Sequence, residues 1–139
     1  LRGAAAAAYT VEPYAGIVVE STTAADTAGV DSSRQVCRLG EGAVVSFMDR
    51  RTIYDKDYYK LALHCGQHAG VKVQLKQAVT GGNDAGAIHC SRGGVRTIAI
   101  SLPCRYIHSG TSIITVEDLE AVYQTVFLTA EKIAGDETV

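Results

Sequence analysis

Three segments of this 139-residue chain carry residues whose types could do chemistry, and two of them could hold a metal ion. Glu20 ends one apolar run, and His108 follows another by a few residues. A carboxylate and an imidazole from separate strands are typical ligands of zinc or cobalt. The third segment is a tight turn before a short predicted helix, formed by Gly81, Gly82, Asn83 and Asp84. The residue types therefore indicate a metal-assisted site.

Each of these signals also has a purely structural interpretation. Glu20 could pair with an arginine or cap a helix, and His108 could be a hydrogen-bonded structural histidine. The turn at 81–84 could be no more than tight backbone and a helix cap. His64 and His68 lie four residues apart on one predicted helix, but Cys65 stands where the H-E-x-x-H motif requires glutamate. We therefore expect that pair to be surface histidines, and His89 to be structural.

Alternating strands and helices are predicted to position these groups. Apolar or alternating runs predict strands at 14–20, 42–48, 71–79 and 97–102, the last stopped by Pro103. Helical spacing predicts helices at 55–68, 85–91 and 116–133. The last of these has its apolar face at Leu119, Val122, Tyr123, Val126, Phe127 and Ala130. This order favours an α/β layered domain with a largely parallel sheet and at least one antiparallel pair.

The ligand-bearing segments should meet at one edge of that sheet. In open α/β sheets, ligands bind in loops beyond the carboxyl ends of the strands. Glu20, the turn at 81–84 and His108 each follow a predicted strand. If these strands are parallel neighbours, a carboxylate, a glycine turn and a histidine gather on one rim.

Composition excludes several other classes of function. Hydrophobic residues make up 47% of the chain and charged residues 20%, enough to bury a core. Thirteen Lys and Arg against fifteen Asp and Glu give a formal charge of −2 without a basic run, which argues against nucleic acid. No apolar stretch approaches the roughly 18–20 residues that span a membrane. The four cysteines form no C-x-x-C pair, which favours free thiols in a reducing, cytoplasmic compartment.

Four motifs together resemble a known family. They are L-R-G-A at 1–4, I-V-V-E-S-T-T-A-A-D-T at 17–27, G-G-N-D-A-G-A-I-H-C-S-R-G-G-V at 81–95 and P-C-R-Y-I-H-S at 103–109. In this order and spacing they resemble the dinuclear metallo-aminopeptidases of the tetrahedral-aminopeptidase, deblocking-aminopeptidase and cellulase-M-like group. The resemblance covers nearly the whole chain.

The resemblance implies a three-layer α/β/α zinc-peptidase-like domain with a mainly parallel, mixed sheet, incomplete at its N-terminus. It implies two divalent metal ions, Zn²⁺ or Co²⁺, with Glu20 as a ligand of one ion and His108 as a ligand of the other. The turn of Gly81, Gly82, Asn83 and Asp84 matches a family motif, G-G-T-D-A, that shapes the substrate pocket. Asn83 stands in place of its threonine.

The same resemblance places other parts of the site before Leu1. The family has E-E-V-G directly before L-R-G-A, and this pair supplies the general-base glutamate and a metal ligand. Residues 1–139 are thus expected to be the carboxyl-terminal part of a catalytic domain, without the dimerisation domain. The intact parent would be a cytoplasmic homo-oligomer that hydrolyses N-terminal residues of peptides through a water activated by two metal ions. The chain alone would be inactive.

Three alternatives remain open at this stage. An endoglucanase-like glycosidase would need two carboxylates flanking the scissile bond, and Glu20, Asp26 and Asp84 offer no pair of known position. A degenerate relative could serve as a non-catalytic binding module. A phosphate site at the turn is physically possible, but the chain lacks the Walker and dinucleotide glycine patterns.

Overall fold

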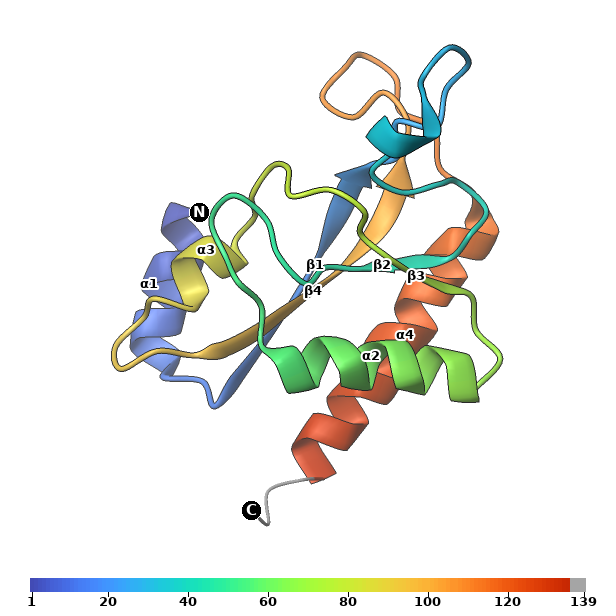
Figure 1. The fold of residues 1–139 in the computed structure, drawn as a ribbon. Coiled ribbons are helices and arrows are strands. Elements are labelled where there is room, and N and C mark those ends of the chain that lie inside the picture. Colours follow the sequence, from blue (N-terminus) through green and yellow to red (C-terminus); the bar gives the residue numbers. More distant parts are fainter. Residues whose placement is uncertain (136–139) are drawn as a thin grey trace.

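The computed structural model of the chain describes residues 1–135 and is built on a four-stranded mixed sheet (Figure 1). Its strands are β1 (Ala15–Thr23), β2 (Ala43–Val45), β3 (Val73–Leu75) and β4 (Arg96–Cys104), in the order β1-β4-β2-β3. β1 runs parallel to β4, and β2 runs parallel to β3. β2 is antiparallel to β4. The expected α/β fold with one antiparallel pair is confirmed.

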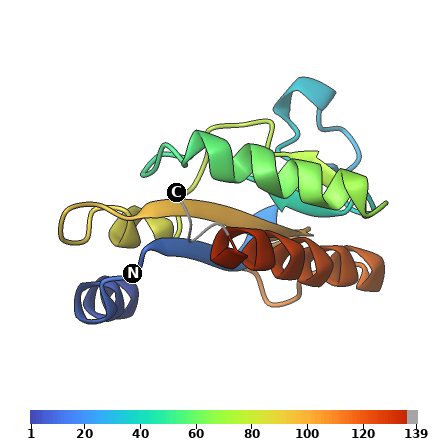
Figure 2. The same cartoon turned by 90° about the horizontal axis from the view of Figure 1, so that it is seen from below.

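Helices cover both faces of this sheet. They are α1 (Arg2–Val11), α2 (Lys56–His68), α3 (Ala85–Ile88) and α4 (Val116–Gly135), with a single 3₁₀ turn, η1, at Ser32–Arg34. In Figure 1, α1 and α3 lie on one side of β1 and β4, whereas α2 and α4 lie on the other. Figure 2 shows the same layers from below, with α1 far from α2 and α4. The layers are therefore α/β/α.

Alternation along β4 divides the core between the two faces. Ile98 and Ile100 are fully buried beneath α2 and α4. Ala99 points the other way, toward Val18 and α3. Burying an isoleucine side chain contributes about 1.5–3 kcal/mol, so this strand anchors both layers. The same period of two places Glu20 on the Val18 face of β1, just past the cover that α3 provides.

The helix expected at 55–68 forms as α2 at Lys56–His68, because its signals are local. Asp55 caps it, accepting hydrogen bonds from the backbone N–H groups of Asp57 and Tyr58, each at 3.0 Å. Arg96 donates two hydrogen bonds to the Asp55 carboxylate, and this interaction lowers the pKa of that carboxyl below its ordinary value. The cap therefore also ties α2 to the start of β4.

The expected end of the last strand was wrong. Pro103 does not stop β4 but lies within it, opposite Thr22 in the parallel register. Because β2 pairs with β4 only at Ile100 and Ser101, the missing N–H of Pro103 costs no ladder hydrogen bond. The predicted runs at 42–48 and 71–79 were too long, since only 43–45 and 73–75 pair as β2 and β3.

The predicted buried face of the last helix was partly right, because Val122 is buried in the core and Val126 packs against it. The largest side chains of that predicted face lie at the surface. Leu119, Tyr123 and Phe127 of α4 are 49%, 65% and 51% exposed. The rotation of the helix is fixed instead by Asp118, which is 1% exposed. Its carboxylate accepts 2.7 Å hydrogen bonds from the backbone N–H groups of two loop residues, Gly40 and Gly42. The side that faces the sheet therefore follows Asp118, not the largest apolar residues.

The buried side of α4 is partly polar, and its hydroxyl groups are satisfied. Thr125 donates to the Ala121 carbonyl at 2.7 Å, and Thr129 donates to the Thr125 carbonyl at 2.6 Å. Both threonines are fully buried. Each hydroxyl bonds within the helix, so these residues can pack against the sheet without an unpaired polar group.

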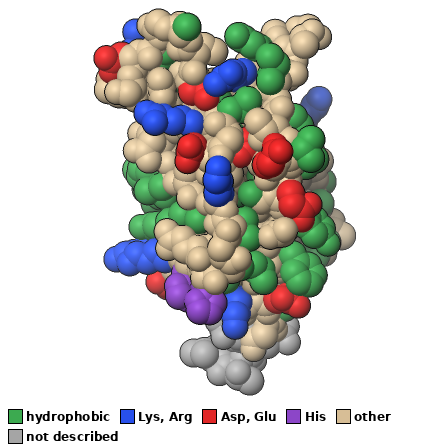
Figure 3. Space-filling model, turned by 90° about the vertical axis from the view of Figure 1, so that its right-hand side faces the viewer, with side chains coloured by type: hydrophobic (Ala, Val, Ile, Leu, Met, Phe, Trp, Pro, Cys, Tyr) green, Lys and Arg blue, Asp and Glu red, His purple; other side chains and the backbone are tan. Residues whose placement is uncertain are grey.

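The surface and the thiols agree with the composition. Within residues 1–135, no helix is both long and apolar enough to cross a bilayer. The face in Figure 3 mixes acidic, basic and hydrophobic side chains and does not separate charge by sign. All four cysteines are free, and three of them, Cys37, Cys65 and Cys104, are buried. Burial raises the pKa of the Cys37 thiol to about 12.

Candidate metal and substrate site

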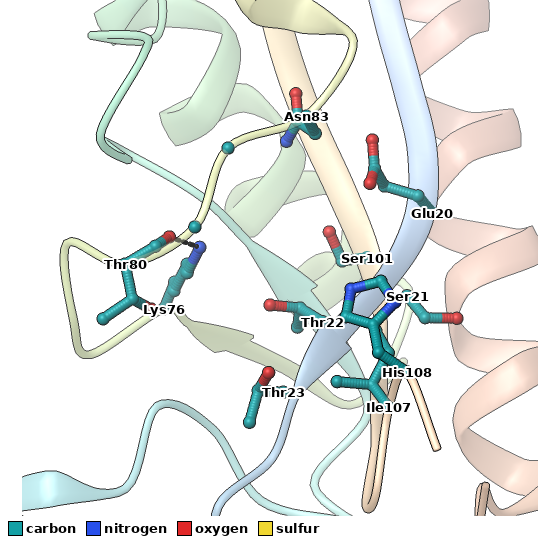
Figure 4. Close-up of a pocket in the computed structure, with 12 residues that line it drawn as sticks. Glu20, Ser21, Thr22, Thr23, Lys76, Thr80, Asn83, Ser101, Ile107 and His108 are labelled. Atoms are coloured by element: carbon teal, nitrogen blue, oxygen red, sulfur yellow. Dashed lines mark hydrogen bonds between the residues drawn. The ribbon is translucent and has the colours of Figure 1, made fainter. Parts of the chain in front are cut away.

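Glu20 and His108 line one cavity of about 410 Å³ at the carboxyl ends of β1 and β4 (Figure 4). Glu20 lies in β1 opposite Ser101 of β4, and His108 lies in the loop that follows β4. The parallel pairing of these strands puts both ends at the same edge of the sheet. The expected meeting of the carboxylate and the imidazole on one rim is therefore observed.

The glycine turn reaches this rim by a different route from the one expected. β3 runs antiparallel to β1 and β4, so its carboxyl end does not point toward the rim. The segment 76–84 instead crosses the face of the sheet after β3. It places Gly81, Gly82 and Asn83 on the wall of the cavity.

Asp84 lies just outside this cavity. Its backbone N–H donates to Oε1 of Glu20 at 3.4 Å, a long hydrogen bond. Its Oδ1 lies 2.9 Å from the α-amino group of Leu1. Leu1, Glu20 and Asp84 share the lining of a smaller neighbouring cavity. Asp84 thus connects the first residue of the chain to the rim.

Asn83 is held by a hydrogen-bonded chain behind the turn. Its Nδ2 donates to the hydroxyl of Tyr54 at 2.7 Å, and its Oδ1 accepts from the backbone N–H of Ala85 at 2.9 Å. Tyr54 in turn donates to Oδ2 of the buried Asp49 at 2.6 Å. Burial, reinforced by Asp49, raises the pKa of Tyr54, so the phenol keeps its proton. Asn83 therefore fixes the shape of the turn.

His108 is carried by a closed loop. Tyr106 and His108 both adopt left-handed backbone, with φ of 60° and 63°. Such residues cost about 1–2 kcal/mol each, so the surrounding contacts must hold them. Two backbone hydrogen bonds between Arg105 and Ile113, of 3.0 and 3.1 Å, close the loop. Because His108 lies within this closed loop, its position depends on how the loop is anchored.

The anchor is an ion pair between the loops that follow β1 and β4. Nε and one terminal nitrogen of Arg105 donate to the two carboxylate oxygens of Asp26, at 2.7 and 2.9 Å. Asp26 also accepts from the backbone N–H of Leu39 at 2.9 Å. The hydrogen bond from Arg105 lowers the pKa of Asp26 below its ordinary value. This pair therefore holds the His108 loop beside the strand that carries Glu20.

Replacing Asp26 by asparagine should destabilise the protein in a pH-dependent way. Because the pKa of Asp26 is lowered in the fold, its contribution is present above the unfolded value of about 4 and is lost as pH falls through the folded value. At pH 7 the variant should lose about 1–2 kcal/mol of unfolding free energy, and below pH 4 the difference should shrink. Urea unfolding between pH 3 and 7 measures this.

The matched control is Glu131→Gln, which removes an exposed carboxylate of α4 that has no hydrogen bond or ion pair within residues 1–135. That variant should unfold almost as the wild type does at every pH. A pH-independent loss in Asp26→Asn would contradict the ion pair as the anchor of the loop.

The donor set suits a metal ion but is incomplete. Partial burial raises the pKa of Glu20, and the negative charges of Asp84 and Asp49 raise it further. The backbone N–H of Asp84 and the charge of Lys76 act in the opposite direction and lower this pKa. A cation beside this carboxylate would favour its ionised form. Within the described residues, no three His, Cys, Asp or Glu side chains gather closely enough to hold a metal. This chain therefore offers part of a ligand set.

Several other residues that line the cavity were not predicted from the sequence. The cavity is also lined by Ser21, Thr22, Thr23, Lys76, Thr80, Ser101 and Ile107. The most unexpected is Lys76, because the alternating run V-K-V-Q-L-K predicts a lysine on the wetter face of a strand. It is only 6% exposed. No pattern in the sequence reveals this burial, because the alternating run continues past Leu75, where the pairing of β3 ends.

The other histidines are arranged as expected. His64 and His68 are exposed on α2, with ring centroids 5.7 Å apart. Nδ1 of His89 lies 2.8 Å from the Ala85 carbonyl, and His89 does not line the cavity. Both expectations are confirmed.

The fold is that of known aminopeptidases. The structure superposes on the TET aminopeptidase of Thaumarchaeota archaeon SCGC AB-539-E09 with a TM-score of 0.87 and 30% sequence identity. The match covers 91% of this chain and 35% of that chain.

The chain belongs to the M42 glutamyl aminopeptidase family, whose sequence pattern matches residues 1–124. It is 37% identical over 118 residues to the glutamyl aminopeptidase of Lactococcus lactis, covering 85% of this chain and 32% of that protein. It is 28% identical over 121 residues to the lysyl aminopeptidase of Pyrococcus furiosus, covering 86% and 34%. The chain thus spans about a third of the length of these relatives.

Proposed function

We propose that this chain is the carboxyl-terminal part of the catalytic domain of a metal-dependent aminopeptidase. The observation that carries the proposal is the meeting of Glu20, His108 and the turn at 81–83 on one cavity, at the ends of two parallel strands. Membership of the M42 family, and relatives named for aminopeptidase activity, support it. The substrates would be peptides.

In this proposal Glu20 and His108 each hold one of two divalent cations, Zn²⁺ or Co²⁺. When bound, such cations polarise a scissile carbonyl and lower the pKa of water from 15.7 toward about 7. Glu20 and His108 do not move protons themselves. The loop closed by Arg105 and Ile113 sets the position of the imidazole, and β1 sets the position of the carboxylate.

The turn and the strand hydroxyls form the substrate side of the cavity. Gly81 and Gly82 bring backbone to its wall, and Asn83 keeps the turn fixed through Tyr54. The hydroxyl-bearing residues Thr22 and Ser101 lie between the two sides of the cavity (Figure 4). These groups would orient the N-terminal residue of a peptide against the metal ligands.

The general base would come from residues joined to Leu1. The backbone nitrogen of Leu1 lies 2.9 Å from Oδ1 of Asp84, so a residue joined to this nitrogen would begin next to Glu20. The family sequence E-E-V-G would put two glutamates three and four residues before Leu1. Three residues of extended chain reach about 10 Å, enough to return a carboxylate to the cavity. A glutamate base contributes roughly 10²–10⁴ in rate.

The remaining features of the proposal concern the whole protein. We infer a cytoplasmic homo-oligomer, with the dimerisation domain outside residues 1–139. No acidic residue other than Glu20 lines the cavity among the described residues, and Asp26 is engaged by Arg105. An endoglucanase-like glycosidase needs two flanking carboxylates, and this alternative is tested by offering cellulose oligomers as substrate. A phosphate site is disfavoured because α3, which follows the turn, has only four residues.

The test uses the full-length protein and the isolated chain side by side. With Zn²⁺ or Co²⁺, the full-length protein should release p-nitroaniline from aminoacyl p-nitroanilides, and a chelator should abolish this release. The 1–139 chain should release none. Cleavage of cellulose oligomers instead of peptides, or full activity in the presence of chelator, would refute the proposal. Metal-dependent activity of the isolated chain would refute the partial-site assignment.

A further inference from the structure

Tyr54 is a buried tyrosine directly behind the turn that forms one wall of the proposed active site. Its side chain is 3% exposed and packs in a cluster with Val18 and Ala99. Its backbone N–H donates to the Phe47 carbonyl at 3.1 Å, which closes the loop that follows β2. Tyr54 does not line the cavity itself. Any influence of Tyr54 on a substrate must therefore pass through the cavity residue that its hydroxyl contacts, Asn83.

The hydrogen bonds of this hydroxyl run in one direction. Asp49 is buried, and its Oδ1 accepts from the backbone N–H groups of Arg51 and Thr52, at 2.7 and 2.9 Å. Its Oδ2 accepts the proton of the Tyr54 hydroxyl at 2.6 Å. Because that proton is used, the Tyr54 oxygen can only accept, and it accepts from Nδ2 of Asn83 at 2.7 Å. Asp49 therefore determines which end of the Asn83 amide faces Tyr54.

The Asn83 amide keeps one N–H group without a partner. A side-chain amide carries two N–H donors, and Tyr54 engages one of them. The amide oxygen accepts from the backbone N–H of Ala85 at 2.9 Å. Within residues 1–135, the second N–H makes no hydrogen bond. Asn83 lines the cavity together with Glu20, and in Figure 4 its nitrogen lies on the cavity side of the side chain. This donor is therefore available to a ligand in the cavity.

A ligand group that meets this N–H must be a hydrogen-bond acceptor. The main chain of a peptide offers its carbonyl oxygens, whereas its N-terminal ammonium only donates. We propose that Asn83 donates this N–H to a main-chain carbonyl oxygen of the substrate, and that Tyr54 is the positioning residue that holds the amide in this orientation. The inference rests on the proposed aminopeptidase function and extends the site to residues that follow β2.

The departure of this chain from the family motif matters for this role. Threonine, which the motif G-G-T-D-A has at this position, carries a single O–H donor and could not donate to Tyr54 and to a substrate at the same time. The amide of Asn83 can do both, since it has two N–H groups. The coupling between Tyr54 and the substrate is therefore specific to a chain with asparagine at position 83.

The test is a double-mutant cycle in the full-length protein with zinc and the tripeptide that the wild type hydrolyses fastest. Asn83→Ala should lower kcat/KM about tenfold, and Tyr54→Phe should lower it about fivefold, as expected for a hydrogen bond between uncharged groups. Added to Asn83→Ala, Tyr54→Phe should cause less than about a twofold further loss, because it acts only through the amide. The metal content should stay at the wild-type value in all three variants.

Tyr58→Phe is the matched control. Tyr58 is a buried tyrosine of α2 whose hydroxyl has no hydrogen-bond partner within residues 1–135, and it does not line the cavity. This variant should keep the wild-type kcat/KM. Asp49→Asn provides a second measurement that leaves the tyrosine in place, because its new N–H group can donate to Tyr54 and reverse the chain. It should lower kcat/KM about fivefold, and melting temperatures identify any variant that misfolds.

Two results would overturn the inference while the proposed function stands. Equal losses from Tyr54→Phe in the wild-type and Asn83→Ala backgrounds would show that Tyr54 acts on the fold and not on the amide. An unchanged kcat/KM in Asn83→Ala would show that the amide makes no contact with the substrate. A wild-type protein that hydrolyses no peptide with added metal would instead refute the proposed function, and this inference with it.

Discussion

Replacing Glu20 or His108 by alanine in the full-length protein should lower kcat/KM for peptide substrates by about 1000-fold or more. Each variant removes one ligand of a different cation, and the attraction that polarises the scissile carbonyl is lost with the cation. The metal content should fall from two ions per site toward one in each variant. Steady-state kinetics and elemental analysis of the purified proteins measure both effects.

Residues of the same types outside the cavity provide the controls. His68→Ala removes an exposed histidine of α2, and Glu41→Ala removes an exposed glutamate of the loop before β2. Both should leave turnover and metal content unchanged. Wild-type turnover in Glu20→Ala or His108→Ala would exclude that residue from the site, even if the family assignment holds.

Gly42→Ala should cost about 4 kcal/mol of unfolding free energy or prevent folding. Gly42 has a φ of 85°, and a Cβ at this position would lie 1.9 Å from the Lys72 carbonyl oxygen. Backbone would have to move, and Gly42 also donates to the buried carboxylate of Asp118. Losses this large come from steric conflict in a region that cannot relax. Urea unfolding curves measure the change.

Gly40→Ala separates backbone strain from steric conflict. Gly40 has nearly the same φ, 81°, and also donates to Asp118, but a Cβ added there would meet nothing within 4 Å. Its replacement should cost only about 1–2 kcal/mol, the cost of a left-handed alanine. Equal losses in the two variants would contradict the close approach of Gly42 to Lys72.

The parts of the fold that depend on residues close together along the chain could be predicted from the sequence. The helix at 55–68 carries its own cap, Asp55, and its own apolar stripe, and it forms almost as expected. The place of Pro103 within β4 and the rotation of α4, which exposes Leu119, Tyr123 and Phe127, could not be predicted, because each depends on a distant partner. The short β2 leaves an edge of β4 free for Pro103, and the loop at Gly40 and Gly42 determines the rotation of α4 through Asp118.

The candidate site also has parts that could be predicted from the sequence and parts that could not. Glu20 and His108 follow predicted strands, and their meeting follows once those strands are parallel neighbours. The turn at 81–84 arrives at the rim by a crossing segment that no local pattern reveals. Lys76 has the sequence pattern of a solvent-facing strand residue, because periodicity does not show that a second layer of chain folds over it.

The location of bound metal tests the central claim most directly. Crystals of the full-length protein grown with zinc should be measured at the zinc absorption edge. We expect two anomalous peaks, one within about 2.0–2.2 Å of a Glu20 carboxylate oxygen and the other within about 2.0–2.1 Å of a His108 ring nitrogen. Peaks bound only to other residues, or an active protein with no peak in this cavity, would contradict the assignment of the rim as a metal centre.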